Sequence, residues 1–561
     1  MVHRNARLTP AGRRILVQRV CEGQPVAHVA KDMGVSRTCA QRYAEHARSM
    51  PAVAGRMWTP RRQALRPHPV GRDPHLDLPH GPGSTPWGTH CKNPDRTGGV
   101  SMTEISFARQ LARHVTADHK LTAEITDWMK LLLFDYYAVT TGGAERDSAV
   151  AIRSAVSTAA SQDRFFSASI HGTTLWATLE DAALVNGVTA HGLELDDTFE
   201  ESSLHPAVVV FPAVLALADE RGYSAADVLR AAAVGYDVMC SAGVLLGAAE
   251  SYGRGFHPTG VAGVLGAAAA VSSLFRLDED QTTHALSLAA NLAAGSLEFL
   301  SDGSWTKRLN AGHAASGGLR AGKLAAADFT APETSIEGRD GFLNQYGQGL
   351  IEGRRLNLVF GKSALDTSIK FYPCCRYMHG NIDLLCDIHS EYPNLDIDEI
   401  ESIEVGVIKA GATLVAEPPA RKLIVNTPVD AQFNMPFGAA VALATGQATV
   451  GQFDDAPAVA AELKPWLEKV RCYTSERLEA TFPASWQAEV SVRFKDGRVI
   501  ERNEAAFRGA PQDRATREQL VDKAAVLLTP SAAQALDETV QAIELDAPLT
   551  GQVVVPQKDS I

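Results

Sequence analysis

The most informative stretch of the chain lies between residues 186 and 206. It reads Asn186-Gly-Val-Thr-Ala-His191-Gly-Leu-Glu194-Leu-Asp196-Asp197-Thr198-Phe-Glu-Glu-Ser-Ser-Leu-His205-Pro206. The part from His191 to His205 holds five carboxylates, three hydroxyls and two histidines, and it follows an apolar, alanine-rich run. Carboxylates in such a setting are costly to bury unless they are paired or used in chemistry. The stretch therefore marks a candidate active site and favours an enzyme.

On both sides of this stretch the pattern is helical, from Phe107 to about Ala327. Ala, Leu and Val recur at spacings of three and four residues in the segments 225–234, 260–274 and 283–297. Small residues fall on several faces of these segments, which is typical of helices packed closely inside a bundle. The pattern predicts a large all-helical domain over residues 102–365.

After Asp366 the pattern changes to alternation. Ile403, Val405 and Val407 alternate with other residues, as do the apolar positions from 488 to 494. Lys495-Asp496-Gly497 then reads as a hairpin turn before a further strand at 499–500. With a helical stretch at 432–445, these strands predict a smaller α+β lid domain over residues 366–505. Residues 506–561 are expected to form helices that return to the first domain, so the fold class is mainly α with an α+β second domain.

Composition fits a globular protein of several domains. The chain has 561 residues, of which 45% are hydrophobic and 21% charged. Its eight cysteines include no CxxC pair, so we expect reduced thiols and neither a zinc nor an iron–sulfur centre. The apolar run from Val261 to Ala270 is interrupted by glycine and is shorter than the roughly 18 residues of a membrane span. Without an apolar signal core at the N-terminus, we expect a cytoplasmic protein and no membrane contact.

The first hundred residues differ in charge from the rest. Residues 1–101 carry a net charge of +10 and the remainder −22. Within residues 1–48, the segment from Val26 leads through Gly34-Val-Ser36 into a second predicted helix with Arg37 and Arg42. This pattern is typical of a helix-turn-helix and resembles the N-terminal region of insertion-sequence transposases. A small helical hairpin with a basic face would give the same pattern.

The following segment argues against a working DNA-binding module. Residues 49–101 are rich in Pro, Gly, Arg and His without any usable period, so we expect a disordered linker or out-of-frame translation. An ordinary amphipathic helix begins just after Met102, and we hypothesise that Met102 is the natural start. Nucleic-acid binding by residues 1–48 is therefore not expected to be the main function. A DNA-binding transposition or regulatory protein stays as the alternative of another class.

Further motifs follow the opening stretch in a fixed order. They are Leu179-Glu-Asp181, Phe256-His257-Pro-Thr-Gly260, Thr306-Lys307-Arg308-Leu-Asn310 and Lys370-Phe-Tyr372-Pro-Cys374-Cys375-Arg376-Tyr-Met-His379. Together with residues 186–206 they resemble the MmgE/PrpD family from about Phe107 to Ala542. The resemblance implies a large helical domain, a smaller α+β lid, a homodimer and no metal or organic cofactor. The family includes 2-methylcitrate dehydratase, cis-aconitate decarboxylase and an iminodisuccinate epimerase, which share proton movement at a carbon beside a carboxylate.

Such a reaction needs a base, an acid and cations for the carboxylates. His205 and His257 are the natural titrating groups, because histidine changes charge near neutral pH. Each precedes a proline, so the alternative is that it is simply the residue at which a helix starts. Lys307 is expected in the catalytic machinery, and Arg308 beside it could clamp a carboxylate bidentately.

The remaining predicted site residues come from the opening stretch and the lid. Asp197 and Thr198 are expected to organise the catalytic site, although the acidic pair Asp196–Asp197 could merely cap the next segment. Substrate binding is further assigned to Glu194, Arg376 and His379. His191 could be a satisfied core histidine, and Tyr372-Pro-Cys-Cys375 is expected to be structural lining rather than a nucleophile.

Three departures from the decarboxylase pattern limit the substrate assignment. The decarboxylase pattern has an aspartate where this chain has Glu194 and a histidine near the position of Cys375, and one extra residue separates Thr198 from His205 here. We therefore expect a lyase that acts on a small di- or tricarboxylate in the manner of 2-methylcitrate dehydratase. The alternative is an isomerase or epimerase of a dicarboxylate such as iminodisuccinate.

Overall fold

The computed structural model describes Val20, residues 24–32 and residues 105–552. The chain divides into two units, residues 1–97 and 98–561. In the first unit the structure describes the helix α2 (Val26–Asp32), which belongs to the first predicted helix of the helix-turn-helix. The second predicted helix and the predicted linker over residues 49–101 lie outside the described residues, as does Met102.

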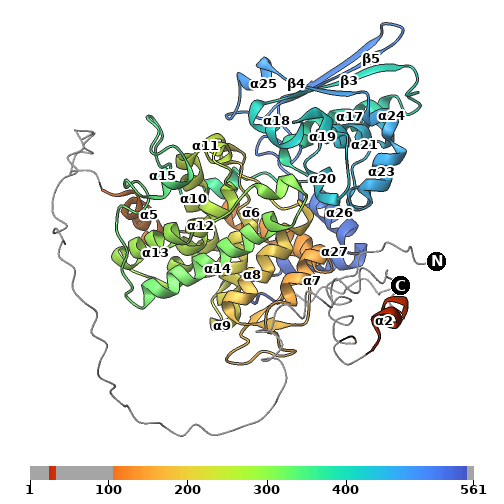
Figure 1. The fold of residues 1–561 in the computed structure, drawn as a ribbon. Helices are drawn as coiled ribbons and strands as arrows, with labels where there is room; N and C mark the ends of the chain where they lie inside the picture. The colour runs from red at the N-terminus through yellow and green to blue at the C-terminus, as the bar shows by residue number, and fades with distance from the viewer. Residues whose placement is uncertain (1–19, 21–23, 33–104, 553–561) are drawn as a thin grey trace, which may run out of the picture. The chain divides into compact units, whose positions relative to one another are not determined.

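The second unit begins with the helical domain, drawn in orange to green in Figure 1. Several of its helices start at a residue whose side chain caps the first turn. Thr122, Ser224 and Asp278 each accept a hydrogen bond from the backbone N–H three residues later. The elements are α5 (Phe107–Thr116), α6 (Ala123–Gly143), α7 (Asp147–Arg153), β1 (Ala168–Ser169), β2 (Trp176–Ala177), α8 (Leu179–Ala190), α9 (Ala207–Arg221), α10 (Ala225–Leu246), α11 (Ala248–Gly253), α12 (Pro258–Phe275), α13 (Glu279–Leu292), α14 (Thr306–Ala326), α15 (Phe342–Tyr346) and α16 (Lys362–Leu365), with 3₁₀ turns η1 (His191–Leu193), η2 (Glu200–Ser202) and η3 (Glu298–Ser301).

Small residues allow the central helices to approach one another closely. A Cβ on Gly187 of α8 would lie 2.7 Å from the Cα of Gly312 in α14, and one on Gly312 would lie 2.2 Å from the carbonyl oxygen of Leu184. Only glycine fits at this crossing. It brings the C-terminal end of α8 beside the first turns of α14, and so sets the Glu194 segment next to Lys307.

The lid domain carries a four-stranded sheet in the order β4-β3-β5-β6. Strand β3 (Ile400–Val407) pairs in parallel with β4 (Val470–Thr474) and antiparallel with β5 (Ala488–Phe494), which forms a hairpin with β6 (Val499–Glu504). Gly497 has φ +90° in the hairpin turn. The alternating residues predicted as strands thus lie in strands. The lid's helical elements are η4 (Arg376–Met378), α17 (His379–Glu391), α18 (Lys409–Val415), α19 (Pro419–Lys422), α20 (Pro428–Gln432), α21 (Met435–Thr445), α22 (Val450–Asp454), α23 (Ala456–Glu462), α24 (Lys464–Leu467) and α25 (Glu476–Glu479).

The lid has its own apolar core, separate from that of the helical domain. Helices α17 and α21 pack on each other and on the sheet, and Figure 1 shows them between the sheet and the helical domain. The fold class predicted from the sequence, mainly α with an α+β second domain, is confirmed.

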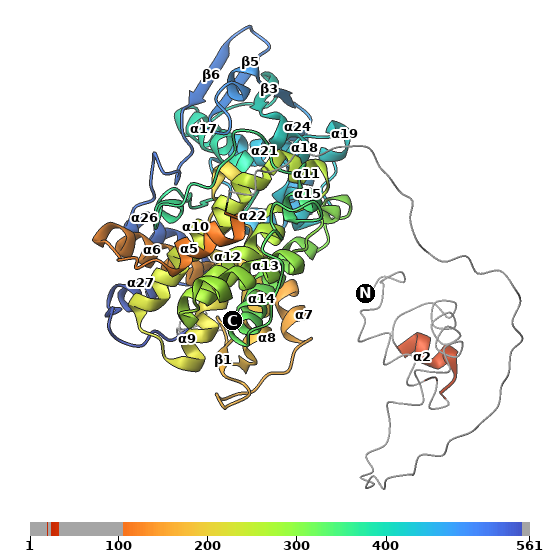
Figure 2. The ribbon, with the colours of Figure 1, turned by 90° about the vertical axis from the view of Figure 1, so that its left-hand side faces the viewer.

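The last two helices, α26 (Arg517–Leu527) and α27 (Pro530–Gln541), pack on α6 of the helical domain (Figure 2). Their buried apolar residues belong to the helical core. Lys523 of α26 is also buried there, where its Nζ lies 2.6 Å from Oδ1 of Asp135 and donates to the carbonyl oxygen of Leu195, 2.8 Å away. This lysine therefore ties the C-terminal helices to the segment that holds Glu194.

Two helices are long and apolar enough to resemble membrane spans, contrary to the expectation from uninterrupted apolar runs. These are α10 and α12, with mean hydropathies of 1.4 and 1.5 over their most apolar windows. The sequence-based expectation counted only uninterrupted apolar residues, so a Gly or Ser ended the run. The mean hydropathy over 18 residues includes these small residues and is high all the same. In both helices 89% of the window is buried inside the protein, as in core helices of globular proteins.

Candidate active site

The segment after α8 reverses direction through a left-handed residue. Glu194 has φ 56° and ψ 30° at the end of η1, and Ser203 has φ 54° at the end of η2. Such a backbone is uncommon for residues other than glycine, and it occurs preferentially where a site over-determines the geometry. Here the turn brings the buried side chains of Glu194, Thr198 and His205 to one cavity.

This cavity of about 30 Å³ lies between the helical domain and the lid. The helical domain supplies most of its charged and titrating groups, and the lid adds Arg376 with a cysteine, a tyrosine and two apolar residues. The lining residues are Glu194, Thr198, Ser203, His205, Tyr252, His257, Leu297, Phe299, Lys307, Cys375, Arg376, Tyr377, Leu414 and Phe433. An acid bound here would therefore meet charged and titrating groups chiefly on the wall that the helical domain forms.

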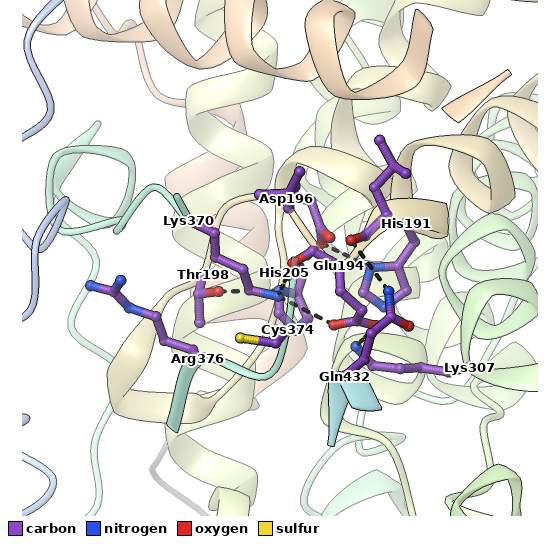
Figure 3. A network of polar contacts seen from close by, with 12 residues as sticks. His191, Glu194, Asp196, Thr198, His205, Lys307, Lys370, Cys374, Arg376 and Gln432 are labelled. Carbon is purple, nitrogen blue, oxygen red and sulfur yellow. Dashed lines mark hydrogen bonds and ion pairs between the residues drawn. The ribbon is translucent and has the colours of Figure 1, made fainter. Parts of the chain in front are cut away.

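Two buried lysines share the carboxylate of Glu194 (Figure 3). Lys307 of α14 donates to Oε1, and Nζ of Lys370 lies 3.3 Å from Oε2 and 3.2 Å from the carbonyl oxygen of Glu194. Burial opposes ionisation of Glu194, but the two ammonium groups outweigh it and hold its pKa below the usual range. The site thus contains an ionised carboxylate between two cations.

The ring of His205 has a defined tautomer. Its Nδ1 lies 2.7 Å from the backbone carbonyl oxygen of Asp197 and 3.2 Å from Oγ1 of Thr198. A carbonyl oxygen only accepts, so Nδ1 carries the hydrogen and Nε2 keeps its lone pair. Burial, followed by the charge of Lys370, holds the pKa of His205 well below the usual range, so the ring is neutral and can accept a proton.

The second pocket histidine has the opposite tautomer. His257 is the N-cap residue of α12, and its Nδ1 lies 3.5 Å from Nδ2 of Asn310. The same amide nitrogen donates to the carbonyl oxygen of Ser296 at 3.2 Å, which fixes the amide orientation. Nδ1 of His257 therefore accepts and Nε2 carries the hydrogen. Burial holds the pKa of His257 well below its usual range, with the charge of Lys307 adding to the effect.

Among the described residues, one group has the donor set of a metal site. His191, His205 and His257 each offer a ring nitrogen within 4.8 Å of the others, and all three are buried. Neutral imidazoles suit zinc-like ions. The ammonium groups of Lys307 and Lys370 act on the same rings and oppose a divalent cation there, whereas the carboxylates of Asp196 and Glu194 favour one. Neutral rings at this spacing also suit proton transfer at a bound acid.

The structure brings most of the sequence-predicted site residues to the cavity. Those that line it are Glu194, Thr198, His205, His257, Lys307 and Arg376. They come from segments that are distant in sequence, and the helical domain and the lid both contribute. Cys375 also lines the cavity, as predicted for a structural position, and burial raises the pKa of its thiol.

The structure places three predicted residues away from the cavity lining. Arg308 points away from the cavity and donates to Oγ of Ser148. Successive residues of a helix point about 100° apart, so Arg308 cannot face the cavity when Lys307 does. Asp197 accepts from the N–H of Ala207 and from the hydroxyl of Tyr236, so its side chain faces the start of α9.

His379, the third, begins α17 behind the pocket. Its ring packs edge-on against Tyr372 at a centroid distance of 5.2 Å, and its Nε2 lies 3.3 Å from the carbonyl oxygen of Cys374. The side chain is buried, and it is not among the residues that line the cavity.

Sequence reasoning missed several residues of the site. Lys370 was quoted within a motif without a role, although a lysine inside an apolar segment is itself a signal of pairing. It is completely buried and contacts Glu194, 176 residues away in the chain. Tyr252 and Tyr377 are also part of the lining, and both hydroxyls bond to Oγ of Ser203.

Comparison with known proteins agrees with this architecture. The model of the MmgE/PrpD N-terminal domain matches residues 109–351, and that of the MmgE/PrpD C-terminal domain matches residues 372–548. The two matches cover most of the helical domain and the lid. The chain belongs to the MmgE/PrpD family. This MmgE/PrpD protein is therefore an enzyme of the lyase class.

Several curated relatives of this MmgE/PrpD enzyme share a single name. Cis-aconitate decarboxylase of Aspergillus terreus is 28% identical over 340 residues, which are 57% of this chain and 68% of the relative. Cis-aconitate decarboxylase of Mus musculus is 25% identical over 350 residues, or 61% and 70% of the two chains. The Homo sapiens enzyme of that name is 26% identical over 355 residues, or 61% and 71%. These relatives carry the name of a decarboxylase, whereas the departures from the decarboxylase pattern at Glu194 and Cys375 favour a dehydratase.

Proposed function

We propose that this chain is a cofactor-independent lyase that moves a proton at a carbon beside a carboxylate of a small di- or tricarboxylate. The observation that carries the proposal is the pair His205 and His257. Both rings line one cavity, both are neutral, and one presents a bare Nε2 while the other presents an Nε2–H. Such a pair can accept a proton and donate a hydrogen bond at the same substrate.

In this proposal His205 is the base. Its Nε2 removes the proton from the carbon next to a carboxylate, and the ring becomes an imidazolium held at Nδ1 by the carbonyl oxygen of Asp197. The electron pair of the C–H bond forms the double bond as the hydroxyl group leaves. The proton on His205 then joins that hydroxyl, so water and an unsaturated acid are the products.

His257 supports the same step from the other side. Its Nε2–H donates a hydrogen bond to the oxygen on which negative charge grows, which is most effective in a cavity closed to water. Lys307 and Arg376 offer cations to the substrate carboxylates. Each is already bonded to a protein carboxylate, Lys307 to Glu194 and Arg376 to Glu200, so the substrate must compete for them.

Dehydration of the 2-methylcitrate type is the first candidate reaction. It rests on the departures from the decarboxylase pattern at Glu194 and Cys375, two residues that line the cavity. Decarboxylation of an acid such as cis-aconitate is the second candidate, supported by the names of the relatives. Epimerisation of a dicarboxylate would use the same proton transfer without loss of a group.

The test is incubation of the protein in deuterated water with a panel of hydroxy-tricarboxylates, cis-aconitate and aspartate-derived acids, followed by NMR. Deuterium beside a carboxylate reports proton transfer, and the product separates loss of water, loss of carbon dioxide and inversion. We expect exchange with at least one acid and its loss in His205→Gln. Absence of exchange with every acid, in protein shown to be folded, would overturn the proposal.

A further inference from the structure

A second layer of polar residues lies directly behind the proposed base. Oδ2 of Asp196 is 2.8 Å from Nδ1 of His191 and 3.3 Å from Nδ1 of His205 (Figure 3). The same carboxylate oxygen therefore lies close to both rings. Asp196 and His191 do not belong to the cavity lining. They contact the proposed base without a surface for substrate, so any influence on the reaction passes through the histidines of the cavity.

His191 packs against both histidines of the cavity. Its ring centroid lies 4.9 Å from that of His205 and 5.8 Å from that of His257, nearly parallel to the latter. Nδ1 of His191 donates to Asp196, and its buried Nε2 makes no hydrogen bond with the described residues. The ring is therefore held from one side only, by the carboxylate that also faces His205.

The charges around His205 explain why this carboxylate matters. The groups that face the ring are Lys370, Lys307, Asp196, His191 and His257. Both lysines disfavour an imidazolium. Among the described residues, Asp196 is the carboxylate within 4 Å of a nitrogen of His205. When His205 takes a proton, Asp196 is thus the negative charge that stabilises the product of that transfer.

We propose that Asp196 is a positioning residue for the reaction, which stabilises the protonated form of His205 and holds His191 as the packing support of both cavity histidines. This inference rests on the proposed function, because it assumes that His205 accepts the proton. A buried carboxylate that orients a histidine and stabilises its imidazolium serves the same purpose in serine hydrolases. Here Asp196 stabilises the imidazolium of the base by its charge alone, because Nδ1–H of His205 donates to the carbonyl oxygen of Asp197, and the same carboxylate orients the ring of His191.

The decisive variant is Asp196→Asn, which keeps the size and one acceptor but removes the charge. With the acid found in the exchange panel, we expect kcat to fall about 100-fold or more and KM to change less than about three-fold. Without the carboxylate the imidazolium is less stable, so the pKa of His205 falls. The low-pH limb of kcat/KM should therefore move to lower pH, which a merely structural change would not cause.

His191 supplies a second pair of variants. His191→Asn keeps a donor at the position of Nδ1 and should retain activity within about five-fold, whereas His191→Leu removes the donor and should lose most of kcat. Asp237→Asn is the matched control, because Asp237 is a buried partner of His114 at 3.1 Å outside the cavity. It should leave kcat and the pH limb unchanged even if it lowers stability.

The outcomes separate the two proposals. An Asp196→Asn enzyme with unchanged kcat, or with an unmoved low-pH limb, would overturn the inference while leaving the proposed function intact. An equal loss of kcat in Asp237→Asn would overturn it as well, because the effect would then belong to any buried Asp–His pair. Absence of exchange in the wild-type protein would instead overturn the proposed function.

Discussion

Lys307 and Arg308 offer a direct test of the site, because they are adjacent in α14 and both buried but point in different directions. Lys307 donates to Glu194 and lies over the ring of Phe433 at 5.1 Å, whereas Arg308 donates to Ser148. Lys307→Met keeps the apolar contact with Phe433 and removes the charge. Arg308→Met makes a comparable change one residue along the helix, outside the cavity.

The magnitude follows from the contact that is lost. A hydrogen bond to a charged group contributes about 1.5–3 kcal/mol, so loss of one bond between Lys307 and a substrate carboxylate should lower kcat/KM about 10- to 150-fold. Glu194 would keep Lys370 as its remaining cation. The assay is turnover or solvent exchange with the acid identified in the panel, with circular dichroism to show folding.

Arg308→Met is expected to stay within about three-fold of wild type in kcat/KM, because Arg308 has no contact with the cavity. Equal losses in the two variants would refute the placement of these side chains and favour the original prediction that Arg308 binds substrate. An unaffected Lys307→Met would refute the carboxylate-binding role itself.

Three further predictions concern other parts of the molecule. Lys523→Met should lower the free energy of unfolding by about 3–5 kcal/mol, since it leaves the buried carboxylate of Asp135 unpaired, and Asp135→Asn in the same chain should restore much of it in urea titrations. Burial raises the pKa of Asp197 to about 8, so the native state binds more protons than the unfolded state between that value and the ordinary aspartate pKa. Stability should therefore fall as pH rises through this window, and Asp197→Asn should flatten the dependence; an unchanged slope would contradict this. Glu200→Gln releases Arg376 from its partner and should lower KM for the acid, and a raised KM would show that Glu200 orients Arg376 for binding.

The fold was largely predictable because its signals are local. The three- and four-residue spacing in segments such as 260–274 and the alternation at 488–494 report helix and strand directly. Strand β4 carried no comparable alternation, and its pairing with β3 depends on a partner about 67 residues away. The sequence likewise identified the stretch around Glu194 as polar within an apolar setting, which is the property that buried sites share.

The directions of individual side chains were not predictable. The sequence Lys307-Arg308 does not indicate which side chain faces the cavity. That depends on the rotation of α14 about its own axis, which its glycine contact with α8 fixes. The turn at Glu194 similarly sends Asp197 towards Tyr236 and leaves Thr198 beside His205. Motifs locate a site to within a turn of helix, and packing decides which residue of that turn reaches it.

Charge balance is the property of the site that sequence reasoning could have used further. The buried carboxylates Glu194 and Asp196 are both held ionised, and burial of anions requires nearby cations. Lys307 alone could not meet that requirement, so a second buried cation was to be expected, and Lys370 supplies it. Because the cations already have partners in the protein, an incoming acid exchanges one carboxylate for another rather than neutralising a free charge. Selectivity among acids then depends on how well each one replaces Glu194 or Glu200 at these cations. An acid with its carboxylates at another spacing would break these ion pairs without forming new ones, and its binding would be weaker.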